Sequence, residues 1–336
     1  MKQAFVTGST GLLGNNLVRM LVEKGIKVKA LARSKEKAKK QFEGLDVEIV
    51  EGDLEDVSKF QSSLIGCDAL FHTAAFFRDN YKGGSHWDEL YKINVKGTET
   101  LLQAAYAAGI RRAVHTSSIA VLDGPRGELI DETMLRQEQD ADDYYRSKIL
   151  ADQVVLDFLK YHSDMFIAMV LPGWMFGPGD VGPTSSGQFV LDFVKGKLPG
   201  VVPGSFSVVD ARDVAATQIL AIERGRSGER YLAAGQHMTM ESIFPLVSEV
   251  SGVKAPTKKV PLTMLKIIAS LSEMYGRLTG KPVLLSKATV KLMIQEENRT
   301  HFNHHKSFQE LGTQFRPVQE TLRSVIQWYE KNGYIT

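Results

Sequence analysis

The sequence predicts an α/β fold built on a doubly wound parallel sheet, and two observations lead to this prediction. Short apolar runs rich in Val, Ile, Phe and Ala alternate with longer segments of helical period, which indicates repeated βαβ units. The chain has 336 residues, of which 43% are hydrophobic and 24% charged, as in globular proteins with a large core. We expect six strands in the main sheet, at residues 3–7, 27–32, 47–50, 69–73, 113–117 and 166–171.

After the sixth strand, the chain changes to loops rich in Gly and Pro, followed by helices and one further strand at residues 230–233. We expect residues 1–172 to form the main domain, with residues 205–235 returning to it. Residues 173–204 and 236–336 would then form a smaller, interleaved C-terminal lobe that binds the substrate.

Composition excludes several classes of partner. Lys and Arg number 41 against 39 Asp and Glu, so the net charge of +2 provides no basic field for a nucleic acid. The apolar stretch 261–271 is too short to span a membrane, so we interpret it as a core or pocket-covering helix and expect no membrane partner. Cys67 is the single cysteine, which excludes an internal disulfide. The chain starts with a strand pattern rather than a secretory leader, so we expect a cytoplasmic location.

Three histidines, His301, His304 and His305, have the close spacing of metal ligands. No carboxylate or thiolate near them completes a ligand set, and a single cysteine cannot build a site on several thiolates. We therefore expect no bound metal.

A glycine-rich loop follows the first strand and opens a helix. Its glycines recur every third residue, which lets the backbone approach a pyrophosphate while the helix N-terminus offers free N–H groups. The strand before and the helix after provide the context that a dinucleotide site requires. We therefore expect a Rossmann-type fold whose phosphate-binding residues are Thr7, Gly8, Thr10, Gly11, Leu12, Leu13 and Gly14.

The end of the second strand indicates NADP(H) as the preferred cofactor. Many NAD enzymes place a carboxylate there to bind the ribose 2'-hydroxyl, but this strand ends at Ala32 and is followed by Arg33. A guanidinium can bind a 2'-phosphate with paired hydrogen bonds and stack on adenine, so we expect NADP(H) and leave NAD(H) open. After the third strand, Asp53 and Leu54 are placed to meet the adenine, although Asp53 could equally cap the helix that follows.

Tyr144 and Lys148 lie four residues apart at the start of a helical segment, and therefore on one face of the helix. Hydride transfer to a carbonyl leaves an alkoxide that must be protonated, and an adjacent ammonium favours the phenolate that results. Of the ten tyrosines, only Tyr144 has a lysine four residues on, so we expect Tyr144 to be the acid and Tyr145 to pack or touch substrate. Ser118 is expected to donate to the same substrate oxygen, although Ser117 is hard to separate from it.

Further motifs follow in order, namely Thr7-Gly8-x-x-Gly11-x-x-Gly14, Asp53-Leu54, His72-Thr73-Ala74-Ala75, Asn94-Val95-x-Gly97-Thr98, Thr116-Ser117-Ser118, Tyr144-x-x-x-Lys148, Gly177-Pro178-Gly179-Asp180 and Val209-Asp210-Ala211-Arg212-Asp213-Val214. With this series the chain resembles, over nearly its whole length, the extended short-chain dehydrogenases/reductases of the NAD-dependent epimerase/dehydratase superfamily. It is most similar to the dihydroflavonol 4-reductase-like and 3β-hydroxysteroid dehydrogenase-like branch.

The resemblance implies several further roles. Lys148 would also hold the nicotinamide ribose, and Asn94 would order the active-site helix or a proton-relay water. The resemblance also implies a homodimer formed through two long helices near residues 87–108 and 143–161. It places against the cofactor Thr73, Ala74, Ala75, Pro172 and Met175.

Two departures from the family's patterns narrow the chemistry. Dehydratases of the family carry Asp-Glu after the active hydroxyl, whereas Ser118 is followed by Ile119 and Ala120, which disfavours elimination of water. Pro172 is preceded by a leucine where the family often has Arg-Pro, which weakens a sugar-nucleotide assignment.

We expect the substrate pocket to include Phe76, Phe77, Ser118, Trp174, Met175 and Phe189.

The aromatic side chains in this set could equally be ordinary core. If they line a pocket, the substrate is an apolar or aromatic ketone or aldehyde. The expected function is therefore that of an NADPH-dependent carbonyl reductase or alcohol dehydrogenase. Two alternatives stay open, a nucleotide-sugar epimerase with bound NAD and a non-catalytic NADP-sensing regulatory protein, although such sensors typically lose the tyrosine that this chain keeps.

Overall fold

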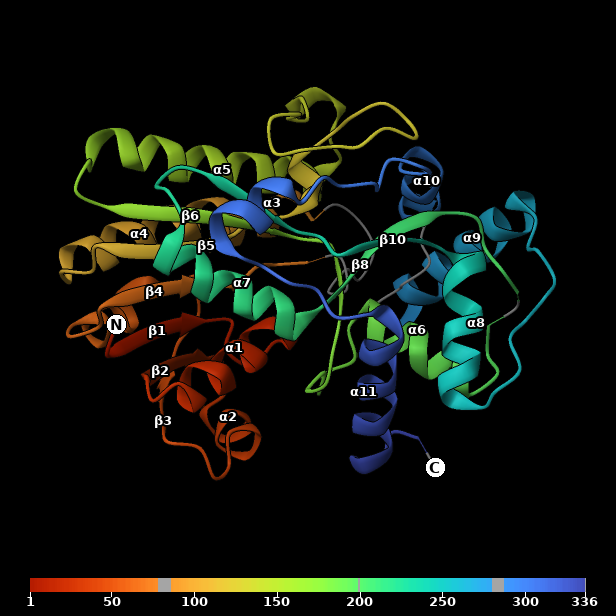
Figure 1. Ribbon diagram of the computed structural model, residues 1–336, viewed down its shortest axis with the longest axis horizontal. Helices are drawn as coiled ribbons and strands as arrows, with labels where there is room; N and C mark the ends of the chain where they lie inside the picture. The colour runs from red at the N-terminus through yellow and green to blue at the C-terminus, as the bar shows by residue number, and fades with distance from the viewer. Residues whose placement is uncertain (78–85, 199, 280–286, 336) are drawn as a thin grey trace.

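The larger of two sheets confirms the predicted fold class. The computed structural model describes residues 1–77, 86–198, 200–279 and 287–335, and Figure 1 shows the larger sheet covered by helices on both faces. Its seven parallel strands are ordered β3-β2-β1-β4-β5-β6-β9. They are β1 (Gln3–Thr7), β2 (Lys27–Ala32), β3 (Val47–Glu51), β4 (Ala69–His72), β5 (Arg112–Thr116), β6 (Phe166–Pro172) and β9 (Arg230–Ala233).

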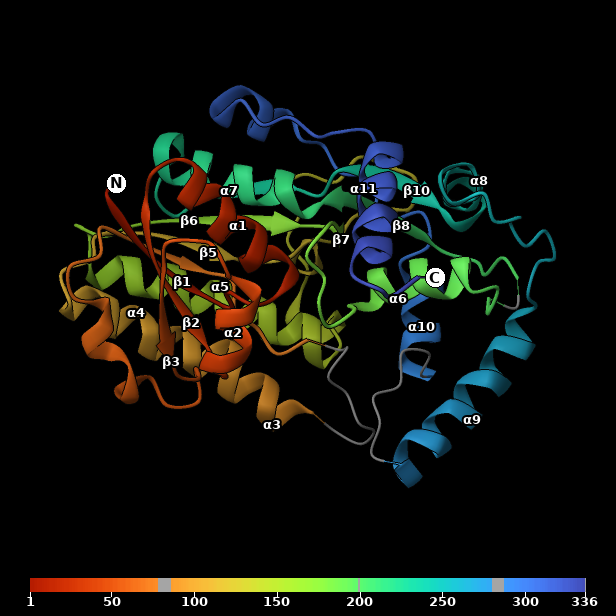
Figure 2. The same cartoon turned by 90° about the horizontal axis from the view of Figure 1, so that it is seen from below.

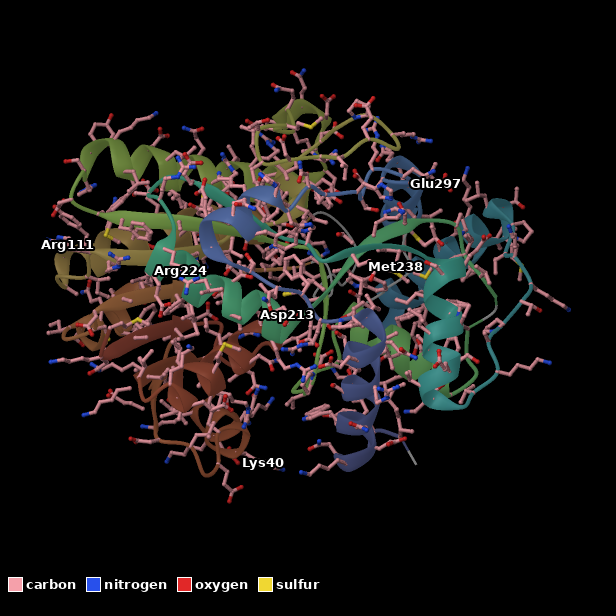
Figure 3. All side chains as sticks on the ribbon, viewed as in Figure 1. Lys40, Arg111, Asp213, Arg224, Met238 and Glu297 are labelled. Atoms are coloured by element: carbon pink, nitrogen blue, oxygen red, sulfur yellow. The ribbon has the colours of Figure 1, made fainter. Side chains whose placement is uncertain are left out.

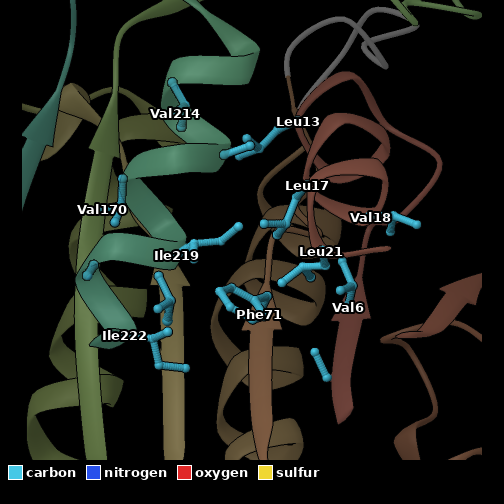
Figure 4. Packing of buried hydrophobic residues seen from close by; sticks show 14 of the residues in the cluster. Val6, Leu13, Leu17, Val18, Leu21, Phe71, Val170, Val214, Ile219 and Ile222 are labelled. Atoms are coloured by element: carbon cyan, nitrogen blue, oxygen red, sulfur yellow. The ribbon is translucent and has the colours of Figure 1, made fainter. Parts of the chain in front are cut away.

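Two pairs of helices enclose this sheet. Helices α1 (Leu12–Glu23) and α7 (Ala211–Arg224) cover one face of the larger sheet. Their apolar side chains are buried against it, as Figure 4 shows. Helices α4 (Gly97–Ala107) and α5 (Asp143–Tyr161) cover the other face. Successive strand residues point to opposite faces, so Val6 packs with α1 and α7 and Phe5 packs with the opposite cluster. Both faces are therefore apolar, as the near-continuous hydrophobic strands predict.

A smaller, three-stranded sheet was not predicted from the sequence. It is ordered β10-β8-β7, with β7 (Trp174–Phe176), β8 (Ser205–Asp210) and β10 (Gln236–Thr239). Gly173 alone separates β6 from β7, and Ala234 and Gly235 separate β9 from β10, so two short crossings join the sheets. The helices around this sheet and at the far end of the molecule are α6 (Ser185–Val194), α8 (Met240–Ser251), α9 (Leu262–Thr279), α10 (Lys287–Gln295) and α11 (Val318–Lys331).

Of the segment 205–235, which we expected to return to the main domain, β8 lies in the smaller sheet, whereas α7 packs on the larger sheet and β9 extends it. The division into two lobes stays a prediction. The motif at residues 209–214 links α7 to the segment before α11: Asp210 caps α7, and the carboxylate of Asp213 accepts the backbone N–H of Arg316 at 2.8 Å. Figure 3 shows Asp213 near the middle of the molecule.

The expected long helix at residues 87–108 is divided. It consists of α3 (Trp87–Leu90), a π-helical turn (Tyr91–Lys96) and α4. Such turns often occur at functional sites, and this one carries Asn94. The remaining short elements are α2 (Lys35–Gln41), 3₁₀ turns at Val57–Lys59, Gln61–Leu64, Ile119–Val121 and Glu138–Asp140, and a second π-helical turn at Ser307–Leu311. Within the described ranges, none of the helices is long and apolar enough to cross a membrane.

Candidate active site

A cavity of about 750 Å³ lies at the carboxyl ends of the larger sheet's strands and extends under the smaller sheet. It includes the loop after β1, where the strand order switches direction between β1 and β4, the place where ligands bind in open α/β sheets. The structure brings most of the predicted site residues to this cavity. Those that line it are Gly8, Thr10, Gly11, Leu12, Leu13, Gly14, Arg33, Asp53, Leu54, Thr73, Ala74, Ala75, Phe76, Phe77, Ser118, Tyr144, Lys148, Pro172, Trp174 and Met175.

The glycine loop can pack closely against itself and against the loop after β4 only because it lacks side chains. Gly8 has a φ of 63°, and a Cβ there would lie 2.7 Å from the backbone nitrogen of Ala74. A Cβ at Gly14 would collide with the carbonyl oxygen of Gly8. Gly11 precedes α1, whose first turn holds no acidic residue, so the open N–H groups face the cavity without a competing negative charge. These features fit a pyrophosphate.

The predicted adenine end brings Arg33 and Asp53 together. Their side chains are 82% and 39% exposed, and Arg33 Nε lies 4.0 Å from Asp53 Oδ2. Asp53 Oδ1 also accepts the backbone N–H of Glu55 at 3.1 Å, so it stabilises the turn after β3 while lining the cavity. Asp56, not Asp53, occupies the N-cap position of the following 3₁₀ turn, without a side-chain capping hydrogen bond. The exposed guanidinium of Arg33 is therefore accessible to a phosphate group.

Tyr144 and Lys148 are both buried at the start of α5, with exposed fractions of 7% and 4%. The carboxylate of Asp142 accepts the backbone N–H of Tyr145 at 2.9 Å and thereby fixes where the helix begins. Lys148 Nζ donates to the carbonyl oxygen of Thr116 at 2.8 Å, which ties the helix to the end of β5. Burial lowers the pKa of Lys148 to about 8, and the charge of Asp152 opposes that effect. With this pKa, the Lys148 side chain is still mostly protonated at neutral pH and can lose its proton just above it.

Sequence reasoning missed the charged groups behind Lys148. Asp152, one helical turn further along α5, is 2% exposed and accepts a hydrogen bond from Arg230 Nε at 2.9 Å. His115 Nε2 lies 3.7 Å from the other carboxylate oxygen, which has no hydrogen-bond partner among the described residues. The spacing of four residues from Lys148 was a signal that could have identified Asp152.

Ser117 and Ser118 both line the cavity, so the structure leaves both alternatives in place. Ser118 Oγ accepts the backbone N–H of Ala120 at 3.1 Å. Ser117 Oγ is buried and has no hydrogen-bond partner within the part of the chain that is described. Each hydroxyl therefore has a proton to donate.

Asn94 lies beside the cavity and connects two of its walls. Its side-chain oxygen accepts the N–H of Phe76 at 2.7 Å, and its Nδ2 donates to the carbonyl oxygen of Phe76 and to Ser147 Oγ, each at 3.0 Å. Since Ser147 belongs to α5, Asn94 fixes the loop after β4 against the active-site helix. Of the two roles that the resemblance implied, this geometry supports the ordering of the helix.

Thr7 does not line the cavity but supports the glycine loop through hydrogen bonds to residues at the end of β4. Its hydroxyl accepts the N–H of Ala74 at 3.3 Å and bonds to His72 Nδ1 at 2.8 Å. Thr98 donates to the carbonyl oxygen of Asn94, so it accepts from His72 Nε2 at 3.0 Å. Burial lowers the pKa of His72 to about 3, which keeps the ring neutral. A chain of hydrogen bonds therefore joins the ends of β1 and β4 to the π-helical turn.

Aromatic and apolar side chains form the predicted substrate side. The rings of Phe77 and Tyr144 meet edge to face with centroids 4.9 Å apart, and Trp174 packs on Phe206 with centroids 4.7 Å apart. Phe189 lies behind Trp174, at 5.6 Å, and does not line the cavity. Its role as a substrate contact stays a prediction.

The far wall of the cavity includes residues that sequence reasoning missed. Phe206 comes from β8, and Met293, Arg299 and Phe302 come from the segment around the end of α10. Arg299 Nη1 donates to Asp123 Oδ1 at 3.1 Å. No local motif marks these residues, because only the fold brings a segment some 150 residues away beside Tyr144.

The late histidines do not gather around a common point. The ring of His301 packs against His237 at 3.6 Å, and His304 Nε2 accepts the backbone N–H groups of Ala234 and Gly235 at 3.2 Å. Within residues 1–77, 86–198, 200–279 and 287–335, no three His, Cys, Asp or Glu side chains are grouped to hold a metal ion.

Comparison with known proteins identifies the family. Residues 4–234 match the family described as "NAD dependent epimerase/dehydratase family". "Putative dihydroflavonol 4-reductase" of Synechocystis sp. is 33% identical, covering 98% of this chain and 95% of that protein. "Sterol demethylase protein B" of Methylococcus capsulatus is also 33% identical, covering 98% and 99%. The crystal structure of gox2253 superposes with a TM-score of 0.82 and 31% identity, covering 100% of both chains. The chain therefore belongs to the NAD-dependent epimerase/dehydratase family of extended short-chain dehydrogenases/reductases, whose members are NAD(P)-dependent oxidoreductases.

Proposed function

We propose that this protein reduces the carbonyl group of a small apolar or aromatic substrate with NADPH, and uses Tyr144 as the general acid. The observation that carries the proposal is that Tyr144 and Lys148, four residues apart on α5, are both buried and both line the cavity, because together they could supply a proton to a carbonyl oxygen bound there. Arg33, with no carboxylate in its place after β2, supports NADP(H) over NAD(H).

The residues of the chain divide the work as follows. The glycine loop and the start of α1 bind the pyrophosphate, and Arg33 binds the 2'-phosphate. The bound nicotinamide supplies the hydride. Tyr144 donates its proton to the substrate oxygen, and Ser118 or Ser117 orients that oxygen by donating a hydrogen bond. Lys148 stabilises the phenolate that remains and holds the nicotinamide ribose.

The second half of the cavity supports the proposed substrate class. Phe76, Phe77, Trp174, Phe206 and Met293 offer apolar surface for a substrate body. A relative from Stigmatella aurantiaca, 34% identical over 82% of this chain and 81% of that protein, is named a "4-hydroxy-2-methyl-3-oxo-4-farnesyl-3,4-dihydroquinoline-1-oxide ketoreductase". Reduction of a ketone on a largely apolar molecule is consistent with these walls.

The epimerase alternative has support from the family's name and from the fold. A UDP-glucose-4-epimerase from Stenotrophomonas maltophila with bound NAD superposes with a TM-score of 0.78 at 18% identity, over 99% of each chain, which shows the fold alone. Arg33 opposes this alternative because epimerases of this type place an acidic residue after the second strand. Net consumption of NADPH distinguishes the two, since an epimerase returns the hydride to its own product. A cofactor sensor would bind NADP and consume none.

The substitution Tyr144→Phe tests the proposal. It removes one hydroxyl and keeps the ring that packs against Phe77, so folding and cofactor binding should survive. Turnover, measured as loss of NADPH absorbance with a panel of ketones and aldehydes, should fall by roughly 100- to 10,000-fold, mainly in kcat. Lys148→Met should lower turnover similarly and also weaken NADPH binding.

Tyr145→Phe is the matched control. It deletes the same atom from the next residue, which also lines the cavity, and should change turnover little. Near-native turnover by Tyr144→Phe, together with loss of turnover in Tyr145→Phe, would show that the acid has been assigned to the wrong tyrosine.

A further inference from the structure

Helix α9 displays a row of large apolar side chains to solvent. Fourteen large hydrophobic side chains are exposed among the described residues, and six of them lie on this helix: Leu262, Met264, Ile267, Leu271, Met274 and Tyr275. Their exposed fractions run from 42% to 62%. Scattered exposed hydrophobic residues are ordinary, but such a concentration on one element marks a binding surface.

The exposed row is separate from the side of α9 that holds the helix in place. Met264, Ile267, Leu271 and Met274 recur at intervals of three and four residues, so they form one stripe along the helix. Leu265 and Ala269 point elsewhere and are buried with Val260 and Val290. The fold therefore does not need the stripe, which Figure 2 places on a helix at the edge of the molecule, away from the larger sheet.

The sequence segment that contains this helix is rich in basic residues. Residues 252–292 contain seven lysines and one arginine against the single acid Glu273, a net charge of +7 in a chain whose total is only +2. Lys254, Lys258, Lys266 and Lys291 are all exposed. The cores of protein–protein interfaces are depleted in lysine, whereas helices that lie on membranes combine an apolar face with basic residues beside it.

We propose that α9 and its lysines form a docking surface for an anionic lipid bilayer. The apolar stripe would enter the boundary between headgroups and acyl chains, and the lysines would contact acidic headgroups. Helix α10 packs against α9 and contributes Met293 to the cavity, so the docked surface lies beside the far wall of the substrate site. Apolar molecules concentrate in bilayers, and a protein docked there meets them where they partition. Our expectation of no membrane partner rested on the lack of a spanning segment, which a peripheral contact does not require.

Co-sedimentation with lipid vesicles tests the docking surface. The full chain is mixed at low ionic strength with vesicles of phosphatidylcholine alone, or of equal parts phosphatidylcholine and phosphatidylglycerol. We expect stronger binding to the mixed vesicles and release by added salt. Ile267→Ser should lower the partition coefficient about fivefold or more, because it removes most of a large apolar side chain that would otherwise be buried in the bilayer. The pair Lys254→Gln and Lys258→Gln should weaken binding to the mixed vesicles alone.

Ile65→Ser is the matched control, since Ile65 and Ile267 are each 62% exposed and Ile65 lies between the 3₁₀ turn at Gln61–Leu64 and β4. Its binding to vesicles should equal that of the native chain. Absence of binding to mixed vesicles, or equal losses in the two serine variants, would overturn the proposal. If light scattering shows a dimer that Ile267→Ser dissociates while vesicles bind nothing, the stripe instead contacts a second copy.

Discussion

Removing the charge of Asp152 should shift the pH range in which this protein works. Residues four apart on a helix have Cβ atoms about 6 Å apart. Two unit charges at about that distance interact by roughly 3 kcal/mol at an effective dielectric constant near 20, which is about two pH units in a pKa. Part of the charge of Asp152 is offset by Arg230, at 2.9 Å. We therefore expect Asp152→Asn to lower the pKa of Lys148 by roughly one to two pH units below its value of about 8.

The sign follows from which form of Lys148 is needed. The ammonium stabilises the phenolate of Tyr144, so activity is lost as pH rises through the pKa of Lys148. In the native chain this loss should set in near pH 8, and in Asp152→Asn one to two pH units lower. The assay is the pH profile of kcat/KM for carbonyl reduction, which reports groups of the free enzyme.

The control is Asp157→Asn, the same change on the same helix. Asp157 is exposed and paired with Lys160 at 2.7 Å, so its variant should keep the native profile. Circular dichroism and a melting curve establish that both variants are folded. An alkaline limb that stays in place in folded Asp152→Asn would refute the reasoning.

Two further predictions concern the cofactor and assembly. Arg33→Asp should weaken NADPH binding selectively, because a carboxylate repels the 2'-phosphate and accepts the 2'-hydroxyl of NADH instead. Titration of both cofactors against the native and variant chains checks this, and equal native affinities would contradict the assignment of Arg33. We also propose a homodimer through α4 and α5, as the resemblance implies; light scattering should give twice the chain mass of 37.3 kDa, and a stable monomer at micromolar concentration would count against it.

The sequence predicted the larger sheet well because each strand is a short apolar run between turn residues. The predicted bounds of β1 and β2 match the structure, those of β3, β4 and β6 differ by one residue at one end, and those of β5 are shifted by one residue at both ends. The smaller sheet escaped prediction because β7 has only three residues and β10 only four, with no extended periodicity. The long helix that the resemblance implied near residues 143–161 is α5, and its helical period is the kind of signal that a sequence carries most clearly.

The site divides along the same line. Residues near the glycine loop and the Tyr144 helix could be predicted because local motifs carry them. Phe206, Met293 and Arg299 could not, because their place in the cavity depends on how distant segments pack. Phe189 was expected to contact the substrate because it is an aromatic residue near a motif; it lies behind Trp174 and outside the cavity lining, and its role stays a prediction.

The two short crossings between the sheets have a consequence for how such a protein can diversify. Gly173 and the pair Ala234 and Gly235 are the points at which β6 and β9 pass into the smaller sheet, and Ser207 Oγ bonds the carbonyl oxygen of Ala234 at 2.9 Å between them. The far wall of the cavity, with Phe206 and Met293, follows the first crossing in the sequence, whereas the glycine loop, Phe76 and Phe77 precede it. Mutations can therefore exchange one half of the cavity's lining while the other half keeps its shape. Proteins with this architecture can therefore evolve new substrate preferences while the cofactor-binding site stays unchanged.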